Sequence, residues 1–151
     1  MRAQLKAGVI GLGILGIQHM RYLAERPEVD VAAVADIRAE KAEAAAASIG
    51  AQAYSDYGQM LREHRLDLVA VATPDPLHRD PVMAAIAAGV PNIMLEKPLA
   101  TTWDDAQAIA DAAEKARTRI FINFANRGSP LDQATHYVIQ RGLLGEVVYG
   151  E

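Results

Sequence analysis

Short apolar segments alternate with longer segments of helical character along most of this chain of 151 residues. The apolar segments that resemble buried strands are 5–10, 29–35, 52–54, 68–72, 92–95 and 120–124. Helical patterns cover 14–26, 38–49, a stretch ending near His64, 78–88 and 102–117. Strands joined through helices of this length require crossover connections, which make neighbouring strands parallel. The alternation therefore predicts an α/β fold, a doubly wound, Rossmann-like parallel sheet with helices on both faces.

The character of the chain changes after residue 124. Residues 125–130 are rich in turn-forming residues, 131–141 have a helical pattern, 142–145 turn, and 146–149 are typical of the start of a strand. A single strand at the end of the sequence has no predicted partner. We therefore expect one complete domain over residues 1–124, and over 125–151 the beginning of a second, α+β domain that this chain does not complete.

Composition excludes several classes of function. A hydrophobic content of 51% with 23% charged residues is typical of a soluble globular protein. The net charge of -4 disfavours nucleic acid or an anionic membrane surface as a partner. Cysteine is absent, which excludes disulfides and thiolate metal sites and agrees with a cytoplasmic enzyme. The four histidines have no metal-ligand spacing, so we expect no metal site.

The N-terminus superficially resembles a secretory signal, because Arg2 and Lys6 precede an apolar run over residues 7–17. Four glycines interrupt that run, and no small-residue cleavage site follows it. No segment approaches the roughly 18 apolar residues of a membrane span. We therefore predict neither a signal peptide nor a membrane anchor.

A glycine-rich turn joins the first predicted strand to the first helix, in the sequence Gly11-Leu12-Gly13-Ile14-Leu15-Gly16. In a dinucleotide site the first glycine allows the tight turn, the second lets the backbone approach a pyrophosphate, and the third lets helix and strand pack closely. The amides of Ile14 and Leu15 at the helix N-terminus would face the phosphates.

An acidic residue follows this turn at the distance a dinucleotide site requires. Asp36 lies 20 residues after Gly16, at the end of the second strand, where a carboxylate can bind the ribose hydroxyls. A carboxylate there repels a 2′-phosphate, which favours NAD over NADP. Arg38 leaves NADP possible, because a guanidinium pairs with phosphate or stacks on adenine; a solvated helix-start residue is the alternative for Arg38.

Further polar residues follow the fourth and fifth strands at the same edge of the sheet. These residues are Thr73-Pro74, His78 and Glu96-Lys97-Pro98. Lys97 can donate a hydrogen bond and help carry a proton. Glu96 can orient the Lys97 side chain or bind the nicotinamide end of the cofactor. Pro98 is a candidate for a cis peptide bond. An ordinary exposed turn is the alternative for Glu-Lys-Pro. His19 suits a structural position on its helix, whereas His64 and His136 are expected on solvent faces without a role.

Taken together, these motifs closely resemble the N-terminal domain of the Gfo/Idh/MocA oxidoreductases, the relatives of glucose-fructose oxidoreductase and inositol dehydrogenase. The resemblance rests on the glycine turn with His19, on Asp36, on Thr73-Pro74 with His78, and on Glu96-Lys97-Pro98-Leu99. Asn126-Arg127 and Gly142-Leu143-Leu144-Gly145-Glu146-Val147 resemble the family's passage into its C-terminal domain. The resemblance covers the whole chain.

The resemblance implies a two-domain, homo-oligomeric dehydrogenase that uses NAD(P) to act on a CH–OH group of a sugar, inositol or related polyol. It implies Lys97 as the catalytic lysine, and Thr73, His78 and Glu96 as residues that line the nicotinamide pocket. The family's substrate-side Asp and His belong to the second domain, beyond residue 151, so the chain alone is expected to be inactive. Asp132 and His136 have a suggestive spacing but fall on the linking helix.

Two other functions stay open at this point. The expected absence of a complete second domain suits a non-catalytic, stand-alone nucleotide-binding module. An S-adenosylmethionine-dependent methyltransferase shares a glycine-rich first turn and an acidic residue after the second strand. The GxGxxG spacing and Glu96-Lys97-Pro98 argue against the methyltransferase.

Overall fold

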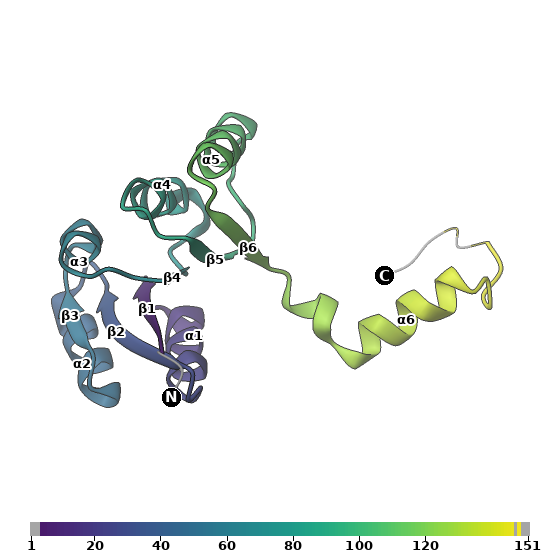
Figure 1. Cartoon of the computed structure of the whole chain (residues 1–151). Coiled ribbons are helices and arrows are strands. Elements are labelled where there is room, and N and C mark those ends of the chain that lie inside the picture. The colour runs from purple at the N-terminus through teal and green to yellow at the C-terminus, as the bar shows by residue number, and fades with distance from the viewer. Residues whose placement is uncertain (1–3, 147, 149–151) are drawn as a thin grey trace.

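The computed structural model describes residues 4–146 and 148 and contains one six-stranded parallel sheet (Figure 1). The strands are β1 (Leu5–Ile10), β2 (Val29–Ala35), β3 (Gln52–Tyr54), β4 (Leu68–Val71), β5 (Asn92–Glu96) and β6 (Arg119–Asn123). The α-helices are α1 (Ile14–Ala24), α2 (Ala39–Ile49), α3 (Tyr57–Glu63), α4 (Arg79–Ala87), α5 (Trp103–Ala116) and α6 (Pro130–Gln140). The strand order β3-β2-β1-β4-β5-β6 confirms the predicted doubly wound α/β fold, and element ends differ from the predicted ones by only a few residues.

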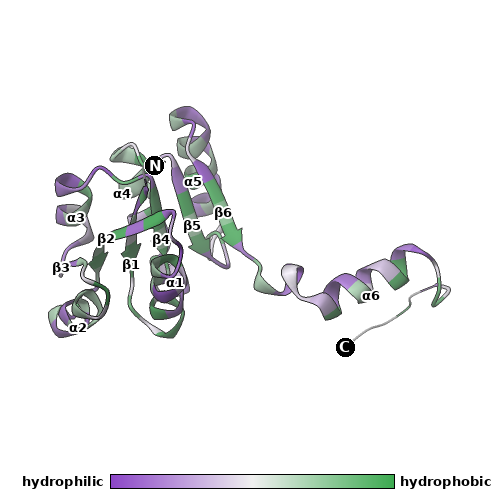
Figure 2. Cartoon of the chain, turned by 60° about the horizontal axis from the view of Figure 1, so that its bottom comes forward, coloured by the Kyte–Doolittle hydropathy of each residue, from purple (hydrophilic) through white to green (hydrophobic). Residues whose placement is uncertain are grey.

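Helices cover the two faces of the sheet unequally. The core on one face joins α1 and α2 to Ala7 and Val9 of β1, whereas the core on the other face joins α3, α4 and α5 to Ile10. This split follows from the period of two along a strand, which sends successive side chains to opposite faces. Figure 2 shows the same layers: the strands are mostly green, or hydrophobic, and the helices on either side of them carry purple, hydrophilic segments.

Local sequence signals fix several helix ends. Gly50 ends α2 in the left-handed conformation, with φ of 76°, which glycine adopts without steric cost. Thr102 begins α5, and its hydroxyl accepts a hydrogen bond of 3.2 Å from the backbone N–H of Asp105. The Thr102 hydroxyl also donates to the Asp105 carboxylate at 2.8 Å, so this pair forms the predicted cap.

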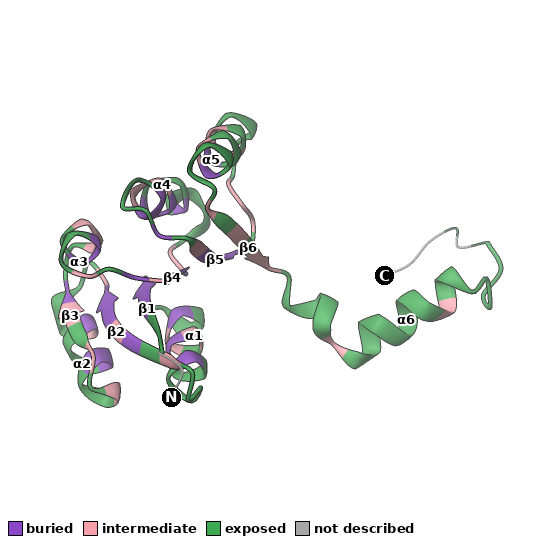
Figure 3. Cartoon of the chain, in the orientation of Figure 1, coloured by how far each residue is buried: buried purple, intermediate pink, exposed green. Residues whose placement is uncertain are grey.

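The last described helix extends away from the sheet (Figure 3). No residue of α6 is buried, and the large apolar side chains Leu131 and Tyr137 are exposed. Phe121 of β6 is also 53% exposed. It lies on the same face of the sheet as α1, which packs over β1, β2 and β4. The predicted strand start at 146–149 falls partly on residues 147 and 149, which lie outside the described residues. Within the described part of the chain, no helix has the length and apolar content needed to cross a bilayer.

Candidate functional site

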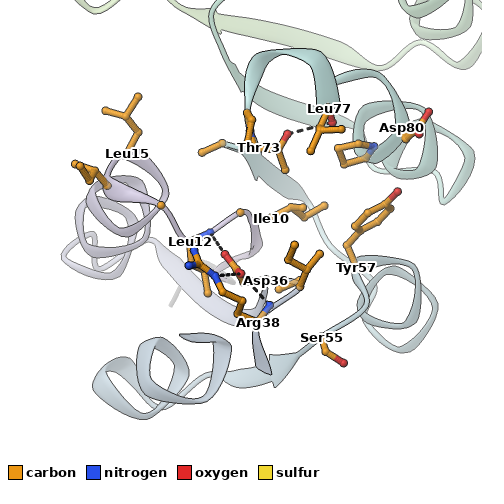
Figure 4. Close-up of a pocket in the computed structure, with 18 residues that line it drawn as sticks. Ile10, Leu12, Leu15, Asp36, Arg38, Ser55, Tyr57, Thr73, Leu77 and Asp80 are labelled. Atoms are coloured by element: carbon orange, nitrogen blue, oxygen red, sulfur yellow. Dashed lines mark hydrogen bonds and ion pairs between the residues drawn. The ribbon is translucent and has the colours of Figure 1, made fainter. Parts of the chain in front are cut away.

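A cavity of about 540 Å³ opens at the carboxyl edge of the sheet, where the strand order reverses between β1 and β4. Its lining comes from the ends of β1 and β2, from the loops after β1, β2, β3 and β4, and from the first residues of α1, α3 and α4 (Figure 4). In open α/β sheets, ligands bind at this reversal because the connections leave the strands on opposite sides and open a crevice. The cavity volume is within the usual range for small-molecule and cofactor sites.

The three glycines of the first turn meet different surroundings. Gly11 has φ of +86°, and a side chain there would begin 2.8 Å from the carbonyl oxygen of Ala72. A Cβ at Gly16 would lie only 1.8 Å from the carbonyl oxygen of Gly11. At Gly13 a Cβ would meet nothing within 4 Å. Gly11 and Gly16 therefore make the tight turn possible, whereas Gly13 leaves open space at the cavity.

The N-terminus of α1 faces this space. Gly13 is the N-cap and has no side chain to satisfy the first backbone N–H groups of the helix. Ile14 and Leu15 line the cavity, and the Ile14 side chain is 81% exposed. Unpaired N–H groups and the positive end of the helix dipole make such a terminus an anion-binding position.

Asp36 is held beside the glycine turn by two backbone donors. Its Oδ2 accepts a hydrogen bond of 2.9 Å from the N–H of Leu12, and its Oδ1 accepts one of 3.0 Å from the N–H of Arg38 (Figure 4). Burial raises the pKa of the Asp36 carboxyl, but these hydrogen bonds and the charges of Arg38 and Lys41 outweigh burial and lower it. An ionised carboxylate has about four acceptor positions, so Asp36 can still accept from two ligand hydroxyls.

The guanidinium of Arg38 stays close to the same carboxylate. Its Nε lies 3.6 Å from Asp36 Oδ1, and about half of the Arg38 side chain is exposed at the cavity rim. Both residues predicted to govern cofactor choice therefore lie at the end of β2.

Glu96 ends β5 with its carboxylate almost fully buried. Glu96 Oε1 lies 2.6 Å from Nε2 of His19 on α1 and 2.7 Å from Nδ2 of Asn123 on β6. Burial raises the pKa of Glu96, but hydrogen bonds from Asn123 and His19, the charge of His19 and the N–H of Lys97 together lower it. The Lys97 side chain is exposed at the sheet edge, and the Lys97–Pro98 bond is cis, as considered from the sequence.

His78 lies where the sequence predicts it but faces inward. Its side chain is 0% exposed, with Nδ1 at 2.7 Å from the Pro98 carbonyl oxygen and Nε2 at 3.0 Å from that of Thr73. Both ring nitrogens are thus directed at backbone acceptors, which differs from a side chain that lines the nicotinamide pocket. His78 joins the loop after β4 to the turn after β5. Thr73 donates to the Leu77 carbonyl oxygen at 3.2 Å and lines the cavity with Pro74.

The predicted residues fall into two groups. Those around the cavity are Gly11, Gly13, Ile14, Leu15, Asp36, Arg38, Thr73 and Pro74. Four others do not line this cavity: Gly16 lies in the first turn of α1, His78 precedes α4, Glu96 ends β5, and Lys97 follows it.

Some residues of the site had no signal in the sequence. Tyr57 and Asp80 complete the cavity wall from α3 and α4, which no local motif indicates. His64 is half-buried, and its Nε2 lies 2.8 Å from the Tyr54 hydroxyl, so the expectation that it lies on a solvent face is wrong. The partner, Tyr54, belongs to β3, and the residue pattern of α3 gives no sign that the two side chains meet. His136 is exposed, as predicted, and borders an open hollow with Arg127 and Asp132.

We expect the stability of the domain to fall in acid because of Asp36 and Glu96. Both carboxyls have a folded-state pKa below their ordinary values of 3.8 and 4.5. Their contribution is therefore complete above about pH 5 and is lost as the pH falls from there through the lowered pKa values. Urea unfolding between about pH 6 and pH 3 should show this loss. Glu96→Gln should reduce the slope against pH; an unchanged slope contradicts the assignment.

Comparison with known proteins agrees with this geometry. Residues 5–124 match the GFO_IDH_MocA family, described as "Oxidoreductase family, NAD-binding Rossmann fold". Inositol 2-dehydrogenase of Klebsiella pneumoniae is 41% identical over 77% of this chain and 35% of its own length. The crystal structure of an NAD binding oxidoreductase from Klebsiella pneumoniae matches 95% of this chain and 40% of its own, with a TM-score of 0.79 and 35% identity.

A third similar protein was crystallised with its ligands. The WlbA dehydrogenase from Bordetella pertussis, in complex with NADH and UDP-GlcNAcA, matches 94% of this chain and 43% of its own, with a TM-score of 0.87 and 27% identity. The chain spans less than half the length of each of these proteins. Because the family match covers most of the residues and the whole parallel sheet, this chain belongs to the Gfo/Idh/MocA oxidoreductase family, and its sheet is the family's NAD-binding Rossmann fold.

Proposed function

We propose that this chain is the cofactor-binding part of an NAD-dependent dehydrogenase that acts on a CH–OH group of a sugar, inositol or related polyol. The observation that supports it most is Asp36, fixed by the Leu12 amide beside an open helix N-terminus. Relatives named inositol 2-dehydrogenase and a relative solved with NADH and a nucleotide sugar support the substrate class.

The residues divide the work between binding and proton transfer. The N–H groups at the start of α1 bind the pyrophosphate, and Gly13 keeps the approach free of a side chain. Asp36 accepts from the adenosine ribose. NAD, when bound, supplies the hydride acceptor or donor. Lys97, at the carboxyl edge of β5, holds or moves the proton of the substrate hydroxyl. The ring nitrogens of His78 contact the carbonyl oxygens of Thr73 and Pro98, and so hold together the two loops that follow β4 and β5.

Residues 125–151 are proposed to begin a substrate and oligomerisation domain. Two observations support this: no residue of α6 is buried, and the chain covers only 35% of the length of the Klebsiella inositol 2-dehydrogenase. A homo-oligomer of the two-domain protein and a cytoplasmic location stay predictions. NADP stays a possible second cofactor because Arg38 lies at the cavity rim.

A parallel titration of the chain with NADH and NADPH tests the binding proposal. We expect NADH to bind more tightly, because Asp36 repels a 2′-phosphate. Asp36→Ser should weaken NADH binding about tenfold and remove most of the preference, since a charged hydrogen-bond acceptor is lost. Asp30→Ser, at the other end of the same strand, is the matched control and should change neither affinity. Binding of neither nucleotide by the unmodified chain would overturn the proposal.

The alternative function is a non-catalytic nucleotide-binding module. Its test is activity rather than binding. NAD reduction with polyols or sugars, and NADH oxidation with the corresponding ketones, would be measured for the 151-residue chain and for a protein that also contains the second domain. Activity confined to the longer protein supports a dehydrogenase. A longer protein that binds NADH but turns over no polyol or sugar favours the module.

A further inference from the structure

Three elements that are distant in sequence meet at one carboxylate oxygen. His19 of α1 and Asn123 of β6 both contact Oε1 of Glu96, across sequence separations of 77 and 27 residues. Glu96 and Asn123 are directly paired neighbours in the β5–β6 register, so their side chains emerge on the same face of the sheet. Since α1 lies on that face, His19 reaches Glu96 from above the strand ends. We call these three residues the His19–Glu96–Asn123 cluster.

The chemistry of the cluster determines which atoms donate. An ionised carboxylate only accepts hydrogen bonds, so both His19 Nε2 and Asn123 Nδ2 carry the protons in these contacts. Only 6% of Glu96 is exposed, which leaves little room for water to replace either donor. Loss of a donor to a buried carboxylate is costly, because the carboxylate then keeps its desolvation without full compensation. The cluster therefore holds the Glu96 side chain in one orientation.

The cluster is placed on a different side of the site from Asp36. A dinucleotide spans the point where the strand order reverses, so one half lies over the end of β2 and the other over the ends of β4 and β5. Asp36 marks the first half, which holds the adenosine. Glu96 is the last residue of β5, and the next residue is Lys97. The cluster thus belongs to the nicotinamide half.

We propose that His19 and Asn123 are positioning residues for the nicotinamide half of the site. Through Glu96 they fix the Glu96-Lys97-Pro98 turn relative to α1, the helix whose N-terminus receives the pyrophosphate. The two halves of the cofactor are then bound at a set spacing. This inference rests on the proposed binding of a dinucleotide, and it assigns function to a histidine that the sequence suggested only as structural.

The test compares NADH with ADP-ribose, which lacks the nicotinamide but keeps the pyrophosphate and adenosine. Calorimetry on the 151-residue chain should show His19→Leu binding NADH about tenfold more weakly, with ADP-ribose affinity changed less than about twofold. His19→Gln should recover most of the loss, because its amide N–H₂ can donate from a position similar to Nε2. His136→Leu, on exposed α6, is the matched control and should alter neither affinity.

Asn123→Leu removes the second donor with little change in volume and should show the same selective loss. If His19→Leu does not fold, Asn123→Leu is the variant whose affinities for NADH and ADP-ribose are compared. Long-range ¹H–¹⁵N spectra supply an independent readout: we expect a proton on Nε2 of His19. Equal losses for both ligands, no loss for NADH, or a bare Nε2 would overturn the positioning role. An unmodified chain that binds neither ligand would instead overturn the proposed function, and this inference with it.

Discussion

Alanine in place of Gly16 is expected to cost the domain its stable fold. The added Cβ would lie 1.8 Å from the carbonyl oxygen of Gly11, and that oxygen belongs to backbone that cannot swing aside like a side chain. Either α1 or the turn must shift, and both are packed against buried residues. We expect the free energy of unfolding to fall by about 3 kcal/mol or more, as for other overpacked sites. Urea unfolding followed by circular dichroism measures it.

Gly13→Ala is the matched control for that experiment. A Cβ at position 13 would have nothing within 4 Å, and the φ of -71° suits any residue. Stability should therefore stay within about 1 kcal/mol of the unmodified chain. NADH binding should nevertheless weaken strongly, because the methyl group would occupy the approach of the pyrophosphate. Equal stability of the two variants would contradict this division between a packing glycine and a binding glycine.

Replacing Lys97 with methionine should nearly abolish turnover in a protein that contains both domains. Methionine keeps much of the side chain's length but can neither hold nor transfer a proton. Loss of a group that transfers a proton typically lowers kcat about 10²- to 10⁴-fold. NADH affinity should change little, since the pyrophosphate and ribose contacts of the Gly11–Gly16 turn and Asp36 remain. Steady-state kinetics and NADH titration of the same preparation separate the two effects.

Two further variants sharpen the result for Lys97. Lys97→Arg keeps the positive charge but holds its proton too tightly to exchange it, so turnover should stay low. Lys115→Met, on the last turn of α5, removes a lysine elsewhere on the surface and should leave kcat unchanged. Full activity of Lys97→Met would eliminate Lys97 as the proton carrier.

The parts of the molecule that local patterns encode could be predicted from the sequence. The alternation of apolar and helical segments specifies the parallel sheet, and Thr102 with Asp105 marks the start of α5. The glycine turn and Asp36 could be placed together because strand ends at one edge of a parallel sheet share a crevice. These inferences need only the residues within one or two elements and the general topology.

Contacts between distant elements were not predictable in the same way. His19 and Glu96 are 77 residues apart, and nothing in either segment indicates that α1 reaches the end of β5. His78 has the expected position, but its full burial depends on the loop after β4 closing over the turn after β5. Such contacts depend on the angle at which helices cross the sheet, which residue spacing along one element does not specify.

The way Asp36 is held has a consequence for how fast a ligand binds. Its two carboxylate oxygens already receive backbone N–H groups from Leu12 and Arg38 before any ligand arrives. We therefore expect the carboxylate to keep this orientation when the ligand binds. Stopped-flow mixing of the chain with nucleotide should then show one exponential phase. Its observed rate constant should rise linearly with nucleotide concentration, as for two preformed surfaces that meet by diffusion.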